Sequence, residues 1–396
     1  MENKVLKPSK TVKLNMMRSL GLDKIDFFLQ NMKNKEEDLE DLDLRYNGFD
    51  PNEVKMILEA LKPCKALKEL NLSNNKMGDE GVKHLCHFLK QNTTLKSLFI
   101  HQNQITDVGM KNICETLEIN DSLEAIYMAN NLFEENAIQY FSKTLKLNKK
   151  LKSFCFGEYF FEIEGVLCLC ESLKQNKSIE TMSIWSCGID TPKMEIIYDL
   201  FKVNKTITDL DIALNNLGEK GKNLVFDLIK KNCTLKKLTL NGDIEENDFE
   251  ILLDTLSYND TLEEISIGVI FDCKSLYKSL KQNHSLIHIE FESVNDNLGM
   301  DHVITLLNSN VKWTPDNHLT FHSEFKKIVP EFLLCLKIFE RTNSLKIPKF
   351  LRYELIKKLD KKSFYYCHFD QENKDFSNQE EKQNKTSQKR KRENPN

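Results

Sequence analysis

Histidine and cysteine are the residues of this sequence best suited to metal binding or nucleophilic chemistry, and their spacing favours neither. His84 and His87 are three residues apart, and His318 and His322 are four apart. Two histidines without a third ligand are weak evidence for zinc. The 11 cysteines form no CxxC pair, and the sequence contains no HExxH, GxSxG or GxxxxGK[ST] motif. We therefore expect no metal, no cofactor and no catalytic residue, as in a non-enzymatic protein.

The length and the charge exclude some classes of protein. A chain of 396 residues is long for one compact core, so it predicts several domains or a repeat array. A net charge of −4 argues against a dedicated nucleic-acid-binding protein. The first residues, MENKVLKPSK, are not followed by an apolar run, and no stretch reaches the apolar length of a membrane span. Scattered cysteines, odd in number, then favour an intracellular, cytoplasmic protein without a membrane partner.

A repeat of 28 residues runs through most of the chain. Leu39, Leu42 and Leu44 begin an LxxLxL pattern, which recurs in one frame from Leu67, Leu95, Leu123, Leu151, Ile179, Ile207 and Leu235. Two shorter steps lead to Leu262 and Leu286, so ten units are counted. A weaker unit precedes them at Thr11, Leu14 and Met16. This regularity predicts one array of stacked units.

Each unit has two halves with different periods. The LxxLxL half alternates and predicts a short strand. The second half has apolar residues at helical spacing, as in Val82, Leu85, Cys86 and Leu89. Cys86, Cys114 and Cys170 occupy the same core position of their units, where free cysteine serves as a small apolar residue. Strands pack about 4.8 Å apart and helices about 8–10 Å apart, so the stack must curve with its strands inside.

The LxxLxLxxNxL pattern, the period and the recurring "Gly…L…L.QN.TLKSL" phrase resemble the ribonuclease-inhibitor-like class of leucine-rich repeats. The resemblance covers residues 39–310. It implies an α/β fold, a solenoid (horseshoe) with a concave parallel β-sheet and convex helices. Members of this class include inhibitors, immune-sensor ligand domains and Ran GTPase activators. A GTPase-activating regulator of the Ran type is therefore one alternative function.

A polar ladder is expected where the chain leaves each strand, because an amide side chain there can satisfy the backbone groups of the turn. Tyr159 and Asp243 fit this position poorly, so we expect local irregularity after their strands. The other units fill it with Asn47, Asn75, Asn103, Asn131, Cys187 and Asn215, and the family allows cysteine in this position.

The ends of the chain depart from the repeat. Residues 1–38 are expected to form an N-terminal cap or a degenerate repeat, and residues 311–360 a C-terminal helical cap. The segment from Phe332 to Leu359 also resembles SOCS-box or F-box segments, which implies the alternative of a ubiquitin-ligase substrate adaptor. Residues 361–396 should be disordered. They end in a basic cluster that is either a nuclear import signal or a solvated tail: Lys389, Arg390, Lys391 and Arg392.

Seven Asn-x-Ser/Thr triplets occur at a fixed point of the repeat, three residues before each strand's first apolar position. We expect them to be structural, with the asparagine ending the helix in a left-handed conformation. They start at Asn92, Asn120, Asn176, Asn204, Asn232, Asn259 and Asn283.

The outward strand positions predict where a partner binds, because the concave sheet of a solenoid is its usual binding surface. The central column should face solvent: Asp43, Asn71, Phe99, Tyr127, Cys155, Ser183, Asp211, Thr239, Ser266 and Glu290. In the next column, Gly157 and Ala213 should leave space beside Trp185. We expect an aromatic centre rimmed by carboxylates, which binds a protein with a basic patch, in a monomer that acts as a scaffold or adaptor. The candidate residues are Phe99, His101, Tyr127, Trp185, Asp209 and Asp211.

Overall fold

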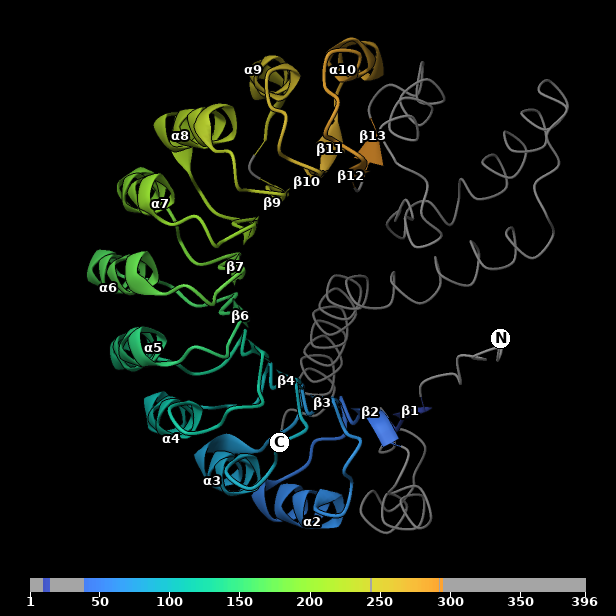
Figure 1. Cartoon of the computed structure of the whole chain (residues 1–396), viewed down its shortest axis with the longest axis vertical. Helices are drawn as coiled ribbons and strands as arrows, with labels where there is room; N and C mark the ends of the chain where they lie inside the picture. The colour runs from blue at the N-terminus through green and yellow to red at the C-terminus, as the bar shows by residue number, and fades with distance from the viewer. Residues whose placement is uncertain (1–9, 15–38, 243, 292, 295–396) are drawn as a thin grey trace, which may run out of the picture. The chain divides into compact units, whose positions relative to one another are not determined.

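The computed structural model describes residues 10–14, 39–242, 244–291 and 293–294. Strands and helices alternate along nearly all of this part of the chain (Figure 1). The strands are β1 (Lys10–Lys13), β2 (Leu39–Asp43), β3 (Glu69–Asn71), β4 (Ser97–Phe99), β5 (Ala125–Tyr127), β6 (Ser153–Cys155), β7 (Thr181–Ser183), β8 (Asp209–Asp211), β9 (Lys237–Thr239), β10 (Glu264–Ser266), β11 (Val269–Ile270), β12 (His288–Glu290) and β13 (Ser293–Val294). The helices are α2 (Pro51–Leu61), α3 (Gly78–Leu89), α4 (Asp107–Leu117), α5 (Glu135–Leu147), α6 (Ile163–Gln175), α7 (Thr191–Val203), α8 (Gly218–Lys231), α9 (Glu246–Ser257) and α10 (Cys273–Leu280).

The chain divides into two compact units. Unit 1 comprises Met1–Ile265 and Lys278–Leu286, and unit 2 comprises Ser266–Tyr277 and Ile287–Asn396. In the described part of unit 2, β11 and β13 form a parallel pair. The candidate binding residues all belong to unit 1.

Unit 1 is built on a parallel sheet whose strands follow chain order from β1 to β9. The register steps by one repeat at each pair: Leu42 lies opposite Leu70, Leu70 opposite Leu98, and Leu98 opposite Ile126. The leucines of the LxxLxL pattern are buried, since successive side chains alternate between the two faces of a strand. The 28-residue repeat predicted from the sequence is therefore also the step in register between neighbouring strands.

The helices form where the sequence supplies both an apolar stripe and a start signal. In α2, Asp50 accepts hydrogen bonds from the backbone N–H groups of Asn52 and Glu53, and Glu53 accepts one from the N–H of Asp50. Pro51 follows at the first helical position, where its missing N–H costs nothing. Val82 and Leu85 of α3 are buried, as the helical spacing predicts.

The strands of unit 1 lie on its concave side and the helices on its convex side (Figure 1). This follows from the two spacings, because helices need about twice the separation of strands. The predicted α/β solenoid with a concave parallel sheet is confirmed. The domain boundaries stay predictions, because most of residues 1–38 and all of 311–396 lie outside the described residues. The same holds for the C-terminal helices and for Lys389, Arg390, Lys391 and Arg392.

Candidate partner-binding surface

Phe99 and Tyr127 form the centre of the concave face, at the ends of β4 and β5. They lie opposite each other in the sheet register. Their rings stack with centroids 4.4 Å apart and planes inclined by 5°. Both side chains are half-buried, so each ring covers one face of the other and leaves part of its surface to solvent. The sequence predicted that the rings would be neighbours, and this contact is what parallel, in-register strands produce.

His101 completes the aromatic cluster. Its ring centroid lies 6.3 Å from that of Phe99 and 6.2 Å from that of Tyr127. The imidazole Nδ1 accepts a hydrogen bond from the backbone N–H of Ala129, at 2.9 Å. Burial, together with the nearby Arg45, lowers the pKa of His101 to about 4. His101 is therefore a neutral ring that fixes the backbone of the next repeat, and it carries no charge for an acidic partner.

Trp185 lies on the same face, in the column that contains His101, three repeats beyond Phe99 and two beyond Tyr127. Its indole is half-buried and lies directly over Gly157 of the preceding repeat. A Cβ atom at Gly157 would overlap the indole atoms Nε1 and Cε2. The expected space on the Gly157 side of the indole is therefore absent, because the indole itself fills it. Ala213, on the other side, is buried.

Asp209 and Asp211 lie in β8, beyond Trp185. Asp211 accepts a hydrogen bond from the Ser183 hydroxyl at 2.8 Å and one from the Ala213 N–H at 3.2 Å. Asp209 is half-buried, and desolvation raises the pKa of its carboxyl to about 6. Lys237 opposes this effect, whereas Asp211 and Glu264 add to it. This end of the face holds more negative than positive charge.

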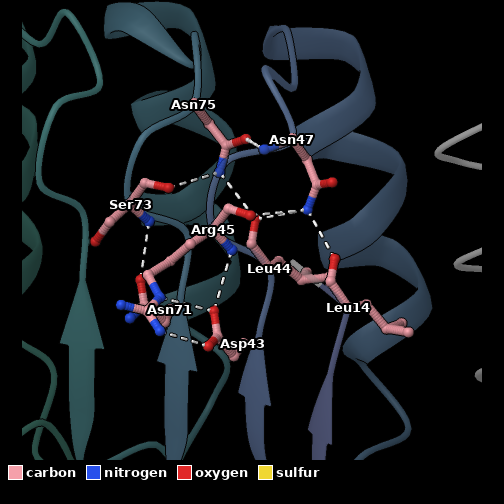
Figure 2. A network of polar contacts seen from close by, with 8 residues as sticks. All are labelled: Leu14, Asp43, Leu44, Arg45, Asn47, Asn71, Ser73 and Asn75. Atoms are coloured by element: carbon pink, nitrogen blue, oxygen red, sulfur yellow. Dashed lines mark hydrogen bonds and ion pairs between the residues drawn. The ribbon is translucent and has the colours of Figure 1, made fainter. Parts of the chain in front are cut away.

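Asp43, another carboxylate expected at the rim, is already paired. Arg45 donates from Nε to Oδ1 at 3.0 Å and from an Nη to Oδ2 at 2.9 Å, a two-point contact on the same strand end (Figure 2). Such paired contacts are geometrically specific and hold both charges in place. The Asp43 carboxylate is therefore not a free charge for a partner.

Half of the central column is less exposed than predicted. Asp43, Asn71, Cys155, Ser183 and Ser266 are buried. These side chains are short, and several turn back onto the backbone. The carboxylate of Asp43 and the amide oxygen of Asn71 accept from the N–H two residues later (Figure 2). Strand alternation gives the face of a residue, but its exposure depends on side-chain length and on such local bonds.

The asparagines after the strands connect successive repeats. The Oδ1 of Asn75 accepts from the N–H groups of Asn47 and Phe49, at 3.2 and 3.0 Å. Its Nδ2 donates to the carbonyl of Leu44 at 3.2 Å (Figure 2). It also donates to the carbonyl of Leu72 at 2.8 Å, so one amide joins two turns. The remaining members occupy equivalent positions and make bonds of the same kind: Asn47, Asn103, Asn131 and Asn215. The backbone N–H of Cys187 donates to the Oδ1 of Asn215 at 2.9 Å.

Comparison with known proteins identifies the repeat. Residues 22–157 match the family described as "TMOD/LMOD Leucine-rich domain", and residues 203–221 match "Leucine Rich repeat". The leucine-rich-repeat protein LegL7 from Legionella pneumophila has a similar structure, with a TM-score of 0.51 at 12% identity over 72% of this chain and 95% of that one. The chain is a leucine-rich-repeat protein.

Two further solved structures match a shorter part of this leucine-rich-repeat chain. "Leiomodin-1 Actin-Binding Site 2 (ABS2)" is 22% identical, with a TM-score of 0.35, and the match covers 38% of this chain and 88% of that one. The tropomodulin C-terminal domain of Caenorhabditis elegans is 15% identical, with a TM-score of 0.33 over 38% of this chain and 92% of that one. A search of the curated proteins gives no match.

The asparagines of the Asn-x-Ser/Thr triplets are bound within the leucine-rich repeats. Asn176 donates to the carbonyl of Leu145 at 2.7 Å and accepts from the N–H groups of Ser178 and Ile179. Its backbone is extended, with φ −72° and ψ 139°, so the expected left-handed conformation is wrong. Asn148 makes the same contacts without a Ser or Thr two residues later. In five of the seven triplets the asparagine Nδ2 donates to the helix of the preceding repeat, so the triplet there is a by-product of this link: Asn120, Asn176, Asn204, Asn259 and Asn283.

The left-handed backbone occurs instead just before the asparagine ladder. Seven non-glycine residues there have φ between 53° and 59° or, for Gln102, 49°: Tyr46, Asn74, Gln102, Asn130, Glu158, Ser186 and Leu214. Glu158 precedes Tyr159 and still follows this pattern, so the expected backbone irregularity is absent there. The Tyr159 hydroxyl instead donates to the carbonyl of Glu134 at 2.7 Å. Asp243, the other departure, lies outside the described residues.

Cysteine chemistry has a structural explanation. Cys86, Cys114 and Cys170 are buried in the helical layer, and burial raises the pKa of the Cys114 and Cys170 thiols to about 12. Such thiols stay protonated at neutral pH and are poor nucleophiles. Within the described part of the chain, no cluster of three His, Cys, Asp or Glu residues could hold a metal ion. None of the helices described is both long and apolar enough to cross a membrane.

The sequence-based search missed an exposed apolar surface on the loops that follow β5 and β6. Phe160 and Leu132 hold the same position in successive repeats, one residue after the ladder position, and are 64% and 59% exposed. Most other units have glycine or a polar residue there: Gly48, Lys76, Gln104, Gly188 and Asn216. A comparison of this column across the repeats would have found the apolar exceptions Leu132, Phe160 and Ile244, of which Ile244 is buried.

Proposed function

We propose that this chain is a non-enzymatic, intracellular protein-interaction module, a monomer that binds a partner protein on the concave face of its leucine-rich repeats. The observation that carries the proposal is the stacked Phe99–Tyr127 pair in the middle of that face. Large aromatic side chains left partly exposed are favoured anchors at protein interfaces. Their rings already hold one arrangement, so little conformational entropy is lost on binding.

The charge on the same face favours a partner with a basic patch. Asp209, Asp211 and Glu264 lie at the β8–β10 end, where Lys237 pairs with the Glu264 carboxylate at 3.4 Å and also lowers the pKa of Asp209. Parallel strands repeat about every 4.8 Å, so β5 and β8 are about 14 Å apart. A partner would place an apolar side chain against Phe99 and Tyr127, and lysine or arginine about 14 Å away. Complementary charge of this kind gives specificity and faster association.

Affinity purification with mass spectrometry tests the proposal. The bait is the full chain, compared with the Phe99→Ala/Tyr127→Ala variant. We expect the partner to be lost from the variant, with at least a tenfold drop in recovery. The midpoint of thermal unfolding should fall only slightly, since both rings are partly exposed.

Tyr258→Ala is the matched control. Tyr258 is an exposed aromatic residue at the end of α9, away from the concave sheet. Its loss should leave partner recovery unchanged. If the Phe99→Ala/Tyr127→Ala variant recovered as much partner as the unchanged chain, the binding site would lie elsewhere.

A further inference from the structure

A second surface, separate from the concave face, lies on the loops after β5 and β6. We call it the edge patch and define it by Leu132, Phe160 and Ile163, with Glu134 and Glu162 beside them. All five side chains are exposed. Leu132 and Phe160 occupy equivalent positions of adjacent repeats, and Asn130 N–H and the Gly157 carbonyl join the two loops at 2.9 Å. Apolar side chains exposed on adjacent loops in this way are typical of an interaction site.

The loops that carry the edge patch are held rigidly from below. Phe133, Tyr159 and Phe161 alternate with the exposed residues and are buried. Tyr159 packs edge-on against Phe133 and Phe161, with centroids 6.2 and 4.9 Å apart. The hydrogen bond from the Tyr159 hydroxyl to Glu134 also ties one loop to the other. Leu132 and Phe160 therefore point outward because their neighbours anchor the backbone.

Phe160 itself is fixed in one orientation. Its ring lies over Gly188 of the next repeat, where a Cβ atom would overlap the ring carbons Cε2 and Cδ2. The Lys193 ammonium lies 4.5 Å from the ring centroid and donates to the Gly188 carbonyl at 2.8 Å. An exposed aromatic ring positioned in this way loses little rotamer freedom on binding, which favours it as an anchor.

The charge around the edge patch has one sign at its surface. Residues 130–142 and 153–173 contain no lysine or arginine, and Glu134, Glu135, Glu162 and Glu164 are exposed. Glu134 and Glu162 occupy the positions that begin α5 and α6, yet neither side chain makes a capping hydrogen bond. Their carboxylates are therefore not used by the helix that follows. Lys193 is buried beneath Phe160, and its charge is engaged there.

We infer that the edge patch binds a basic amphipathic segment of another protein, one that presents apolar side chains flanked by lysine or arginine. The apolar side chains contact Leu132 and Phe160, and the cations face Glu134 and Glu162. An acidic segment or an anionic surface would be repelled by the same carboxylates. This inference does not depend on the concave site, because the two surfaces share none of their defining residues.

The probe is a labelled synthetic peptide of alternating leucine and lysine pairs, which forms an amphipathic helix. A peptide with glutamate in place of lysine is the charge-reversed control. Fluorescence anisotropy with the full chain gives the Kd. The Leu132→Ala/Phe160→Ala variant should weaken binding of the leucine–lysine peptide at least tenfold. Glu134→Gln/Glu162→Gln should weaken it severalfold and reduce its salt dependence. The leucine–glutamate peptide should not bind.

The matched control is Ile119→Ala/Leu147→Ala. Ile119 lies just after α4 and Leu147 at the end of α5, and they are 63% and 58% exposed. This control should change the Kd less than twofold. The inference would be overturned if Ile119→Ala/Leu147→Ala weakened peptide binding as much as Leu132→Ala/Phe160→Ala does. It would also be overturned if only Phe99→Ala/Tyr127→Ala weakened peptide binding.

Two other occupants give different results. A second copy of the chain would appear as a dimer in sedimentation that Phe160→Ala dissociates. If the chain's own basic end occupied the edge patch, it would compete with the peptide. Replacing Lys389, Arg390, Lys391 and Arg392 by glutamine would then raise peptide affinity tenfold. Either result would overturn the assignment of the edge patch to a separate protein.

Discussion

At the scale of single residues, Asp209 carries an electrostatic cost. Burial raises the pKa of this carboxyl from the ordinary value of 3.8 to about 6. Between these two values the folded protein binds more protons than the unfolded chain does. Stability due to this group is therefore greatest below about pH 4 and is lost as the pH rises through 6. A cation supplied by a partner would remove this cost.

Replacement of Asp209 by asparagine should consequently stabilise the protein at pH 7.5. We expect a gain of roughly 1–2 kcal/mol, less than the full pKa shift implies, because solvent still reaches the group. Urea unfolding at pH 7.5 and pH 4 measures it, and the gain should vanish at the lower pH. A variant that is less stable than the parent at pH 7.5 would show that the Asp209 charge is stabilising.

The sequence predicts residue contacts along the sheet better than exposure. The contact of Phe99 with Tyr127 follows from counting repeats, since strands in register bring equivalent residues together. The position of Trp185 over Gly157 does not follow, because it depends on a side-chain rotamer. Similarly, burial of Asn71 arises from a bond to its own backbone two residues on, which no repeat count reveals.

At the scale of strands and turns, the asparagine ladder joins each repeat to the next. Asn75 is buried, and its amide satisfies backbone groups of two successive turns. Removing it leaves the N–H groups of Asn47 and Phe49 without this acceptor. An unsatisfied buried donor typically costs about 1–3 kcal/mol.

Asn75→Ala should therefore destabilise the array by roughly 2–4 kcal/mol. The exposed neighbour Lys76 supplies the comparison, and Lys76→Ala should change stability by less than about 0.5 kcal/mol. Denaturant midpoints of the two variants measure the difference. If both variants unfolded at the same urea concentration as the parent, the ladder would contribute no net stability.

The order of strand and helix in each repeat, and the residues that face inward, could be read from the sequence because apolar periodicity determines which face packs inward. Turn conformation could not. Asparagine alone suggests the left-handed region, but Asn176 is extended, and the left-handed residue is the one before the ladder position, as at Glu158. Tyr159 is a second example, because tyrosine takes the place of the ladder asparagine there and the residue before it still has the left-handed backbone.

At the scale of the whole array, a leucine-rich-repeat solenoid exposes surfaces that different side chains define independently. In unit 1 the concave sheet presents Phe99 and Tyr127, whereas the loop edge presents Leu132 and Phe160. Each repeat contacts mainly its neighbours, so stability is close to a sum of local terms. Substitutions at one exposed surface should therefore leave the other surface folded, and binding at the two can be tested separately.

Site-specific photo-crosslinking tests the central claim, that a partner protein binds against the aromatic centre of the concave face. Benzoylphenylalanine is introduced at Tyr127 in one protein and at Tyr258 in another, and each is irradiated with the co-purified partner. We predict a covalent adduct from position 127 and none from position 258. A partner that crosslinks from 258, or that remains bound without crosslinking from 127, would contradict this account.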